Sequence, residues 1–85
     1  MIYIDTKGHM VADSISELCM GAWMIGLKRE WIQTPETHLH YDLTTKRKVE
    51  KALSELSHIT IVDSRVILEK SKLLTEEWIE KGYKI

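Results

Sequence analysis

The chain has 85 residues, the size of one compact domain. Its composition, 44% hydrophobic and 29% charged, is that of a globular protein and excludes a disordered chain. Because 12 basic residues are set against 13 acidic residues, the net charge of −1 excludes the strong overall positive field of a dedicated nucleic-acid-binding chain, while a local basic patch stays open.

The first half of the chain predicts two strands around one helix. Residues 2–5 (IYID) are β-branched and aromatic, which is typical of a strand, and a polar loop follows them. Ser14 and Glu17 have capping-box spacing, so we expect a helix from near residue 14 to Gly26. Residues 30–34 (EWIQT) predict a second strand that ends before Pro35, and 37–43 is expected to be extended or irregular.

The second half predicts further helices around a third strand. Apolar residues at helical spacing predict a helix from about Thr44 to Leu56. Residues 58–62 (HITIV) give the clearest strand pattern in the chain. Asp63 and Ser64 then predict the start of a third helix, and Thr75 is expected to cap one more short helix.

This order predicts an α/β fold. Strands that alternate with helices favour parallel pairing, so we expect a small two-layer or three-layer domain with a three-stranded, mostly parallel sheet (β-α-β-α-β-α). Residues 1–74 would form the domain, and 75–85 a helical tail packed on it or on a partner subunit. A sheet this small leaves one face uncovered, which favours a homo-oligomer.

The single cysteine, Cys19, excludes an internal disulfide and is expected to be a buried, inert thiol. The first residues have no basic start followed by a long apolar run, so we expect no signal peptide. No segment reaches the ~20 apolar residues that span a bilayer. We therefore expect a protein of the reducing cytoplasm without a membrane partner.

Polar side chains follow each predicted strand. In open parallel sheets, ligands bind at the carboxyl ends of the strands, so these side chains are expected at one edge. They are Asp5, Lys7, His9 and Asp13 in the first loop; His38, His40, Asp42 and Thr44 in the second; and Asp63, Ser64 and Arg65 in the third. His58 precedes the third strand and is expected at the opposite edge.

Residues 37–44 read THLHYDLT. If 38–42 is extended, His38, His40 and Asp42 point to one side of the chain. Two imidazoles and a carboxylate on one face suit a divalent metal, a phosphorylated ligand, or general acid–base chemistry. His9, Asp13, His40 and Asp42 are the candidate metal ligands, and His9, His40 and Asp42 the candidate catalytic groups.

Each of these residues also has a structural interpretation. Asp42 or Thr44 is suited to cap the second helix, and Asp13 and Asp63 to cap the first and third. A histidine such as His38 on an exposed strand is often only a surface residue. His40 is harder to explain in that way, because apolar Leu39 and Tyr41 flank it.

The start of the second helix, TTKRK, gathers Thr44, Lys46 and other basic side chains. Helix N-termini bind anions, whereas the helix dipole favours acids at that position, so lysine here hints at an anionic ligand. A solvated basic face is the alternative. Each of the three tryptophans is expected in the core or at an interface, and Trp31, which should lie closest to this edge, is the one candidate for a ligand contact.

The segments YID, GHMVAD, EL, IGL, EWIQ and HYDLT occur in an order that resembles domain-of-unknown-function family 4031, a group of short bacterial and phage proteins. The resemblance covers roughly residues 2 to 65. It implies that His9, Asp13, His40, Tyr41 and Asp42 match the polar positions of the family. The residues ELSH before the third strand depart from it, and the tail after Leu74 lies outside it.

Three functions remain open. The favoured one is a small binding protein for an anionic, nucleotide-like ligand held by Asp5, His9, Asp13, His40, Tyr41, Asp42, Thr44 and Lys46. The second is a metal-dependent phosphoester hydrolase or nuclease that uses the His/Asp cluster and a divalent metal. The third is an interaction module in which the polar edge consists only of helix caps. Nucleic acid is not excluded as a partner.

Overall fold

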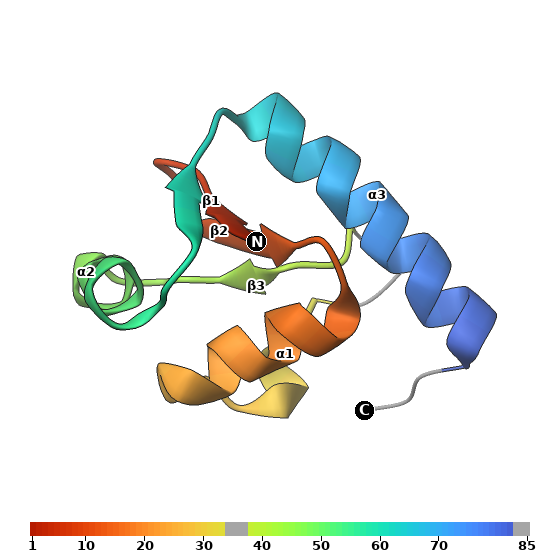
Figure 1. Cartoon of the computed structure of the whole chain (residues 1–85), viewed down its shortest axis with the longest axis horizontal. Coiled ribbons are helices and arrows are strands. Elements are labelled where there is room, and N and C mark those ends of the chain that lie inside the picture. The colour runs from red at the N-terminus through yellow and green to blue at the C-terminus, as the bar shows by residue number, and fades with distance from the viewer. Residues whose placement is uncertain (34–37, 83–85) are drawn as a thin grey trace.

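The computed structural model describes residues 1–33 and 38–82, and within them the fold is α/β, as predicted. Three helices surround a four-stranded sheet in the order β3-β2-β1-β4 (Figure 1). The strands are β1 (Ile2–Ile4), β2 (His9–Ala12), β3 (Tyr41–Asp42) and β4 (Ile59–Ile61). The helices are α1 (Ile15–Met24), α2 (Lys46–Glu55) and α3 (Ser64–Lys81), with the 3₁₀ helix η1 (Arg29–Trp31) between α1 and β3.

The sheet is mixed, so the prediction of a three-stranded, mostly parallel sheet is wrong. Strand β1 pairs antiparallel with β2, β2 pairs antiparallel with β3, and β1 pairs parallel with β4. The extra strand arises from a tight hairpin after β1. Gly8 closes it with φ of +91°, a conformation that glycine adopts without strain, and its N–H donates to the Asp5 carbonyl at 3.2 Å. The residues after Gly8 therefore fold back on β1 instead of forming a loop.

The predicted strand over 30–34 is also wrong. Trp31 ends η1 and lies outside the sheet, and Gln33 forms only an isolated bridge with His40. Thr34 and Pro35, which would complete that prediction, lie outside the described residues. The described part of the region that is expected to be extended or irregular, residues 38–43, contains β3.

Two of the helix starts agree with the predictions. The Ser14 hydroxyl accepts the Glu17 N–H at 3.2 Å, and the Asp63 carboxylate accepts the amides of Arg65 and Val66 at the start of α3. Helix α2 starts at Lys46, with Thr45 as its cap, so neither Asp42 nor Thr44 caps it. None of the described helices is long and apolar enough to cross a membrane.

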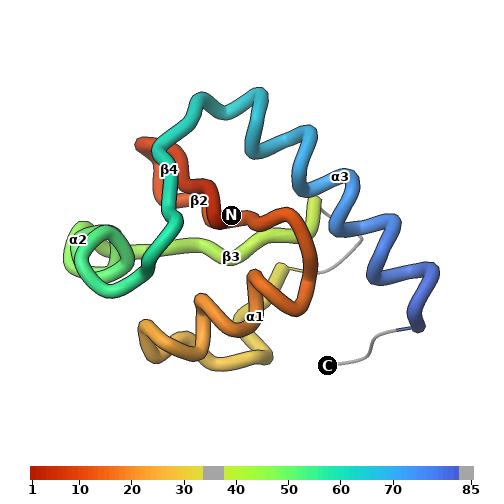
Figure 2. The backbone as a smooth tube through the Cα atoms, viewed as in Figure 1, coloured from red at the N-terminus to blue at the C-terminus, as the bar shows by residue number. Residues whose placement is uncertain are grey.

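Helix α3 is continuous through the predicted boundary at residue 74, so the separate short helix after it does not form. Thr75 lies inside α3, where its hydroxyl donates to the Ser71 carbonyl at 2.8 Å. The buried residues Ile67, Ser71, Leu74 and Trp78 recur at helical spacing along the whole element, and this single stripe explains its continuity. Figure 2 traces the chain from α2 through β4 into this helix.

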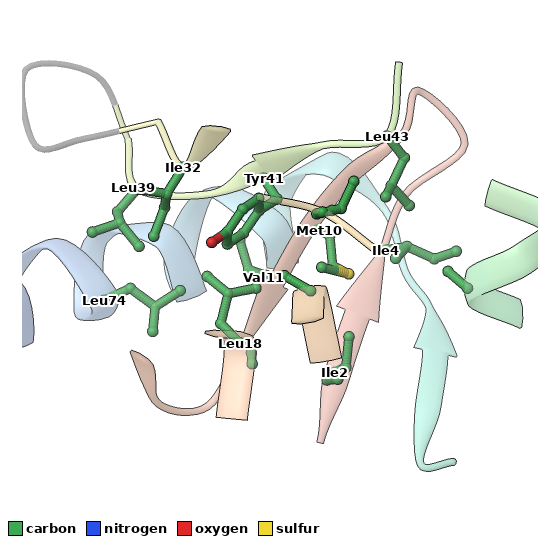
Figure 3. Close-up of a cluster of buried hydrophobic side chains, with 14 of the residues drawn as sticks. Ile2, Ile4, Met10, Val11, Leu18, Ile32, Leu39, Tyr41, Leu43 and Leu74 are labelled. Carbon is green, nitrogen blue, oxygen red and sulfur yellow. The ribbon is translucent and has the colours of Figure 1, made fainter. Parts of the chain in front are cut away.

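The apolar core packs the sheet against α1 and also against α3, which contributes Ile67, Leu74 and Trp78. Figure 3 shows Met10 and Tyr41 of the sheet beside Leu18 of α1. Side chains alternate along a strand, so the neighbours His9 and Asp42 point to the opposite face, toward α3. At this end of the sheet, Met10 and Tyr41 form an apolar face, and His9 and Asp42 share the other face, on which Val11 farther along β2 is also buried.

Candidate metal centre

The polar residues meet at one edge of the sheet, although the strands run differently from the prediction. The carboxyl ends of β1 and β4 lie at the same edge because these strands are parallel. The start of β2 joins that edge through the hairpin, and the end of β3 joins it by antiparallel pairing with β2. His9 and Asp42 are direct partners in this register, so their side chains lie on one face next to each other.

His9, His40 and Asp42 form a cluster in which one ligand atom from each lies within 4.8 Å of the others. The His40 Nε2 is 3.1 Å and the His9 Nε2 3.8 Å from the Asp42 Oδ1. The two imidazole rings stand edge to face with centroids 5.3 Å apart. Metal–ligand bonds of about 2.0–2.2 Å separate neighbouring ligand atoms by roughly 3–3.5 Å, so the cluster is close to the spacing that a bound ion needs.

The orientation of His9 is fixed by Asp5. The His9 Nδ1 lies 2.9 Å from the Asp5 Oδ2, and an ionised carboxylate only accepts hydrogen bonds. The Nδ1 of His9 must therefore carry the proton, which leaves a lone pair on the Nε2 of the neutral ring. A carboxylate behind a histidine is the usual arrangement for histidines that bind metal.

A backbone group fixes the ring orientation of His40 in the same way. Its Nδ1 contacts the carbonyl oxygen of His38, which also only accepts. In the neutral ring the Nε2 of His40 is thus an acceptor as well. Two proton-free nitrogens and a carboxylate oxygen then face one another, an arrangement that repels itself unless a cation or a proton lies between them.

Asp5 has the surroundings of a permanently charged group. Its side chain is only 2% exposed, and its Oδ1 accepts the N–H groups of Lys7 at 3.0 Å and His9 at 2.9 Å. Burial raises the pKa of Asp5, but the hydrogen bonds from His9 and Lys7 outweigh it and hold the pKa below its ordinary value. The hydroxyl of Ser64, at the start of α3, donates to the second oxygen at 3.4 Å.

A cavity of about 320 Å³ lies between this cluster and α3. Its volume suits a small ligand or one group of a larger one. The sheet side contributes polar side chains, and the helix side contributes two apolar side chains and two serines. The lining residues are Asp5, Lys7, His9, His38 and His40 on the sheet side and Ser64, Ile67, Leu68 and Ser71 on α3.

Two predicted site residues lie elsewhere. Asp13 follows the far end of β2, so the structure does not bring it to the cluster as a metal ligand. It accepts hydrogen bonds from Tyr3 at 3.1 Å and Lys70 at 2.7 Å, and the Lys70 bond lowers its pKa. Tyr41 is buried on the apolar face, where its hydroxyl donates to the Arg29 carbonyl at 3.5 Å. Burial raises the pKa of Tyr41 to about 12, so it is a core residue.

The remaining predicted residues lie around the cluster. Thr44 follows β3 and accepts a hydrogen bond from the Lys48 ammonium at 3.2 Å. Lys46 is exposed in the first turn of α2. His58 precedes β4, at the opposite edge as expected. Ser71 was not predicted to line the cavity, and its only sequence signal is a small polar residue within the apolar stripe of α3.

Comparison with known proteins gives one family. No curated protein and no solved structure matches the chain significantly. The family described as "Protein of unknown function (DUF4031)" matches residues 3–68, which include most of β1, all of β2 to β4, the start of α3 and every member of the cluster. Since this match spans most of the 85 residues, the chain belongs to the DUF4031 family.

Proposed function

We propose that this domain binds one divalent transition-metal ion through the Nε2 atoms of His9 and His40 and the carboxylate of Asp42, and that it hydrolyses a phosphoester there. The observation that carries the proposal is the convergence of two imidazole nitrogens and a carboxylate oxygen that all lie within 4.8 Å of one another. Two imidazoles and a carboxylate are a common ligand set for divalent zinc, iron or manganese.

The number and exposure of the ligands favour a reactive centre over a structural one. Structural zinc sites close the coordination sphere with four protein ligands, whereas catalytic sites use three and leave a position for water. The side chains of His9 and Asp42 are 38% and 41% exposed, so the open position faces solvent and the cavity. Lys7 lines the same cavity and supplies positive charge for an anionic substrate.

The reaction at such a centre is a displacement at phosphorus. A divalent ion held by His9, His40 and Asp42 would supply a water that loses a proton near neutral pH. Attack of that water on phosphorus would form one P–O bond while the ester P–O bond breaks, and the alcohol would leave with the proton that the water has lost. The ion would also neutralise charge on the phosphoryl oxygens, together with the Lys7 ammonium that lines the cavity.

Metal content tests the first step. Protein purified in trace metals should hold about one ion per chain by mass spectrometry, and His40→Ala should lose it. His58→Asn is the matched control, because it removes an exposed histidine at the opposite edge and asparagine tolerates the positive φ of 55° at that position. A content far below one ion, or one that His40→Ala leaves unchanged, overturns the proposal.

Hydrolysis of bis-(p-nitrophenyl) phosphate tests the second step. Activity should disappear with EDTA, return on addition of Zn²⁺ or Mn²⁺, and be absent in His9→Ala at every metal concentration that the wild type needs. Full metal occupancy without turnover would support the metal centre and contradict the proposed hydrolase activity.

The predicted cytoplasmic location and homo-oligomer stay predictions, and light scattering on the purified chain measures the subunit number.

A further inference from the structure

A second groove adjoins the candidate metal centre on the other side of Asp42. It holds about 400 Å³ and is lined by Glu30, Trp31, Gln33, Asp42, Thr44 and Lys48. The Asp42 carboxylate therefore borders both the groove and the cluster with the histidines. Gln33 ties the groove to His40 through the backbone, since its N–H donates to the His40 carbonyl at 2.8 Å.

The groove has one exposed aromatic ring with positive charge around it. Trp31 is 44% exposed, and the ammonium groups of Lys28 and Lys48 lie 5.7 Å and 4.9 Å from its ring centre. Lys28 precedes η1, whereas Lys48 belongs to the first turn of α2. Two separate segments thus bring cations to the same ring, within a chain whose net charge is −1.

The start of α2 adds further positive charge, although the helix dipole disfavours basic residues at that position. The first turn contains Lys46, Arg47 and Lys48 and no acid, although the helix dipole stabilises acids there. Lys46 and Arg47 are exposed and form no ion pair with any residue between 1 and 33 or 38 and 82. The Thr45 hydroxyl already accepts the Lys48 N–H, so an arriving anion would meet side chains.

We propose that this groove binds a nucleotide unit, with its base on Trp31 and its phosphate at Lys28, Lys48 and the Thr44 hydroxyl. Every base presents a π-face, and stacking on an aromatic ring next to basic side chains is the common mode of single-strand binding. A free nucleotide and a nucleotide within a single strand share this chemistry. In a strand bound this way, the phosphoester next to the bound nucleotide would lie at the metal ion, so nucleic acid would be the substrate class of the hydrolase. This last step rests on the proposed function.

Two acidic side chains border the groove and are expected to weaken phosphate binding when no metal ion is bound. Glu30 and Asp42 repel a phosphate, but a metal ion on Asp42 removes one of these two charges. Affinity for a nucleotide is therefore expected to be measurable in EDTA and to rise when Zn²⁺ is added. Binding in EDTA does not depend on the metal centre, so the two proposals fail separately.

The experiment is a titration of six-nucleotide single-stranded DNA and RNA, followed by fluorescence anisotropy, and of AMP, followed by calorimetry, each in EDTA and in Zn²⁺. Trp31→Ala should weaken binding about tenfold or more. Lys48→Met should weaken it and reduce the salt dependence by the equivalent of about one phosphate. Trp23→Ala and Lys72→Met are the matched controls, because both residues are exposed on helices away from the groove.

Each outcome decides the matter. Binding of the strands alone, lost with Trp31→Ala and kept with Trp23→Ala, supports the groove and assigns it to single strands. The same pattern with AMP assigns it to a free nucleotide. The proposal is overturned if no probe binds in either buffer, or if Trp31→Ala binds as the wild type does. Equal losses in the two tryptophan variants, or in the two lysine variants, also overturn it.

Discussion

Asp5→Asn tests whether the orientation of His9 makes the candidate metal centre. In the wild type, the Asp5 Oδ1 accepts two backbone amides, and the Oδ2 accepts the His9 Nδ1–H at 2.9 Å. The asparagine must keep its carbonyl toward the two amides, since the reverse orientation would direct its NH₂ at two donors. Its NH₂ group then faces His9 and donates to the Nδ1. The proton moves to the Nε2, which can no longer bind metal in that form.

The expected loss is set by the role of Asp5 behind the ligand. Removing a carboxylate partner of a metal-binding histidine lowers metal affinity by about 10–100-fold. The fold is expected to lose about 1–3 kcal/mol, because a charge-assisted hydrogen bond of a buried group becomes a neutral one. A chelator competition measures the Zn²⁺ affinity, and long-range ¹H–¹⁵N NMR reads which nitrogen of His9 carries the proton.

Asp63→Asn is the control, since it removes a carboxylate near the same edge and keeps the cap of α3. It should leave the Zn²⁺ affinity within about twofold of the wild type, because it does not contact His9. The reasoning is refuted if Asp5→Asn binds Zn²⁺ as the wild type does, or if affinity falls while the proton of His9 stays on the Nδ1.

Three further predictions concern stability. Thr75→Val removes the hydroxyl that accepts the Leu39 N–H at 3.2 Å and should lower the free energy of unfolding by about 1–3 kcal/mol, whereas Thr75→Ser should restore it. Equal urea midpoints for these two variants would contradict this. Gly8→Ala places a methyl group 2.6 Å from the Leu43 carbonyl oxygen at φ of +91° and should cost about 2 kcal/mol or more in the same assay. An unchanged midpoint would show that the hairpin relaxes freely. Burial raises the pKa of Glu77, but hydrogen bonds from the first amide of α1 and from a lysine one turn later outweigh it, so the folded pKa lies below the unfolded one. Its stabilisation is therefore complete above the unfolded pKa and is lost as the pH falls through the folded one, so urea unfolding between about pH 6 and pH 3 should be less pH-dependent in Glu77→Gln. Parallel curves for the two proteins would disprove this.

The helix starts could be predicted because they are local. Ser14 and Asp63 bind amides within three residues of themselves, and these contacts are visible in sequence spacing. The sheet depends on longer-range pairing. His9 begins a strand of only four residues whose partner, Asp42, lies more than 30 positions away. Such a strand carries too little pattern to separate it from a loop.

The candidate cluster was predicted from an incorrect topology. His9 was placed at the carboxyl edge as part of a loop, and it lies there because a hairpin returns the chain to that edge. The same reasoning fails for Asp13, since four strand residues carry it to the other end of the sheet. Asp5 follows the first strand in both descriptions, so its position does not depend on the difference, whereas Asp42 is expected in a loop and reaches the edge as the end of β3.

The cavity is shared between two distant parts of the chain. The histidines and the carboxylate of the cluster come from residues 9 to 42, whereas the opposite wall comes from α3, with Ile67, Leu68 and Ser71. A ligand in this cavity would therefore contact a helix that contributes no member of the cluster. If the proposed function holds, substitutions on that helix face would offer a route to a different substrate preference, because they would alter the wall while the histidines and the carboxylate stay in place.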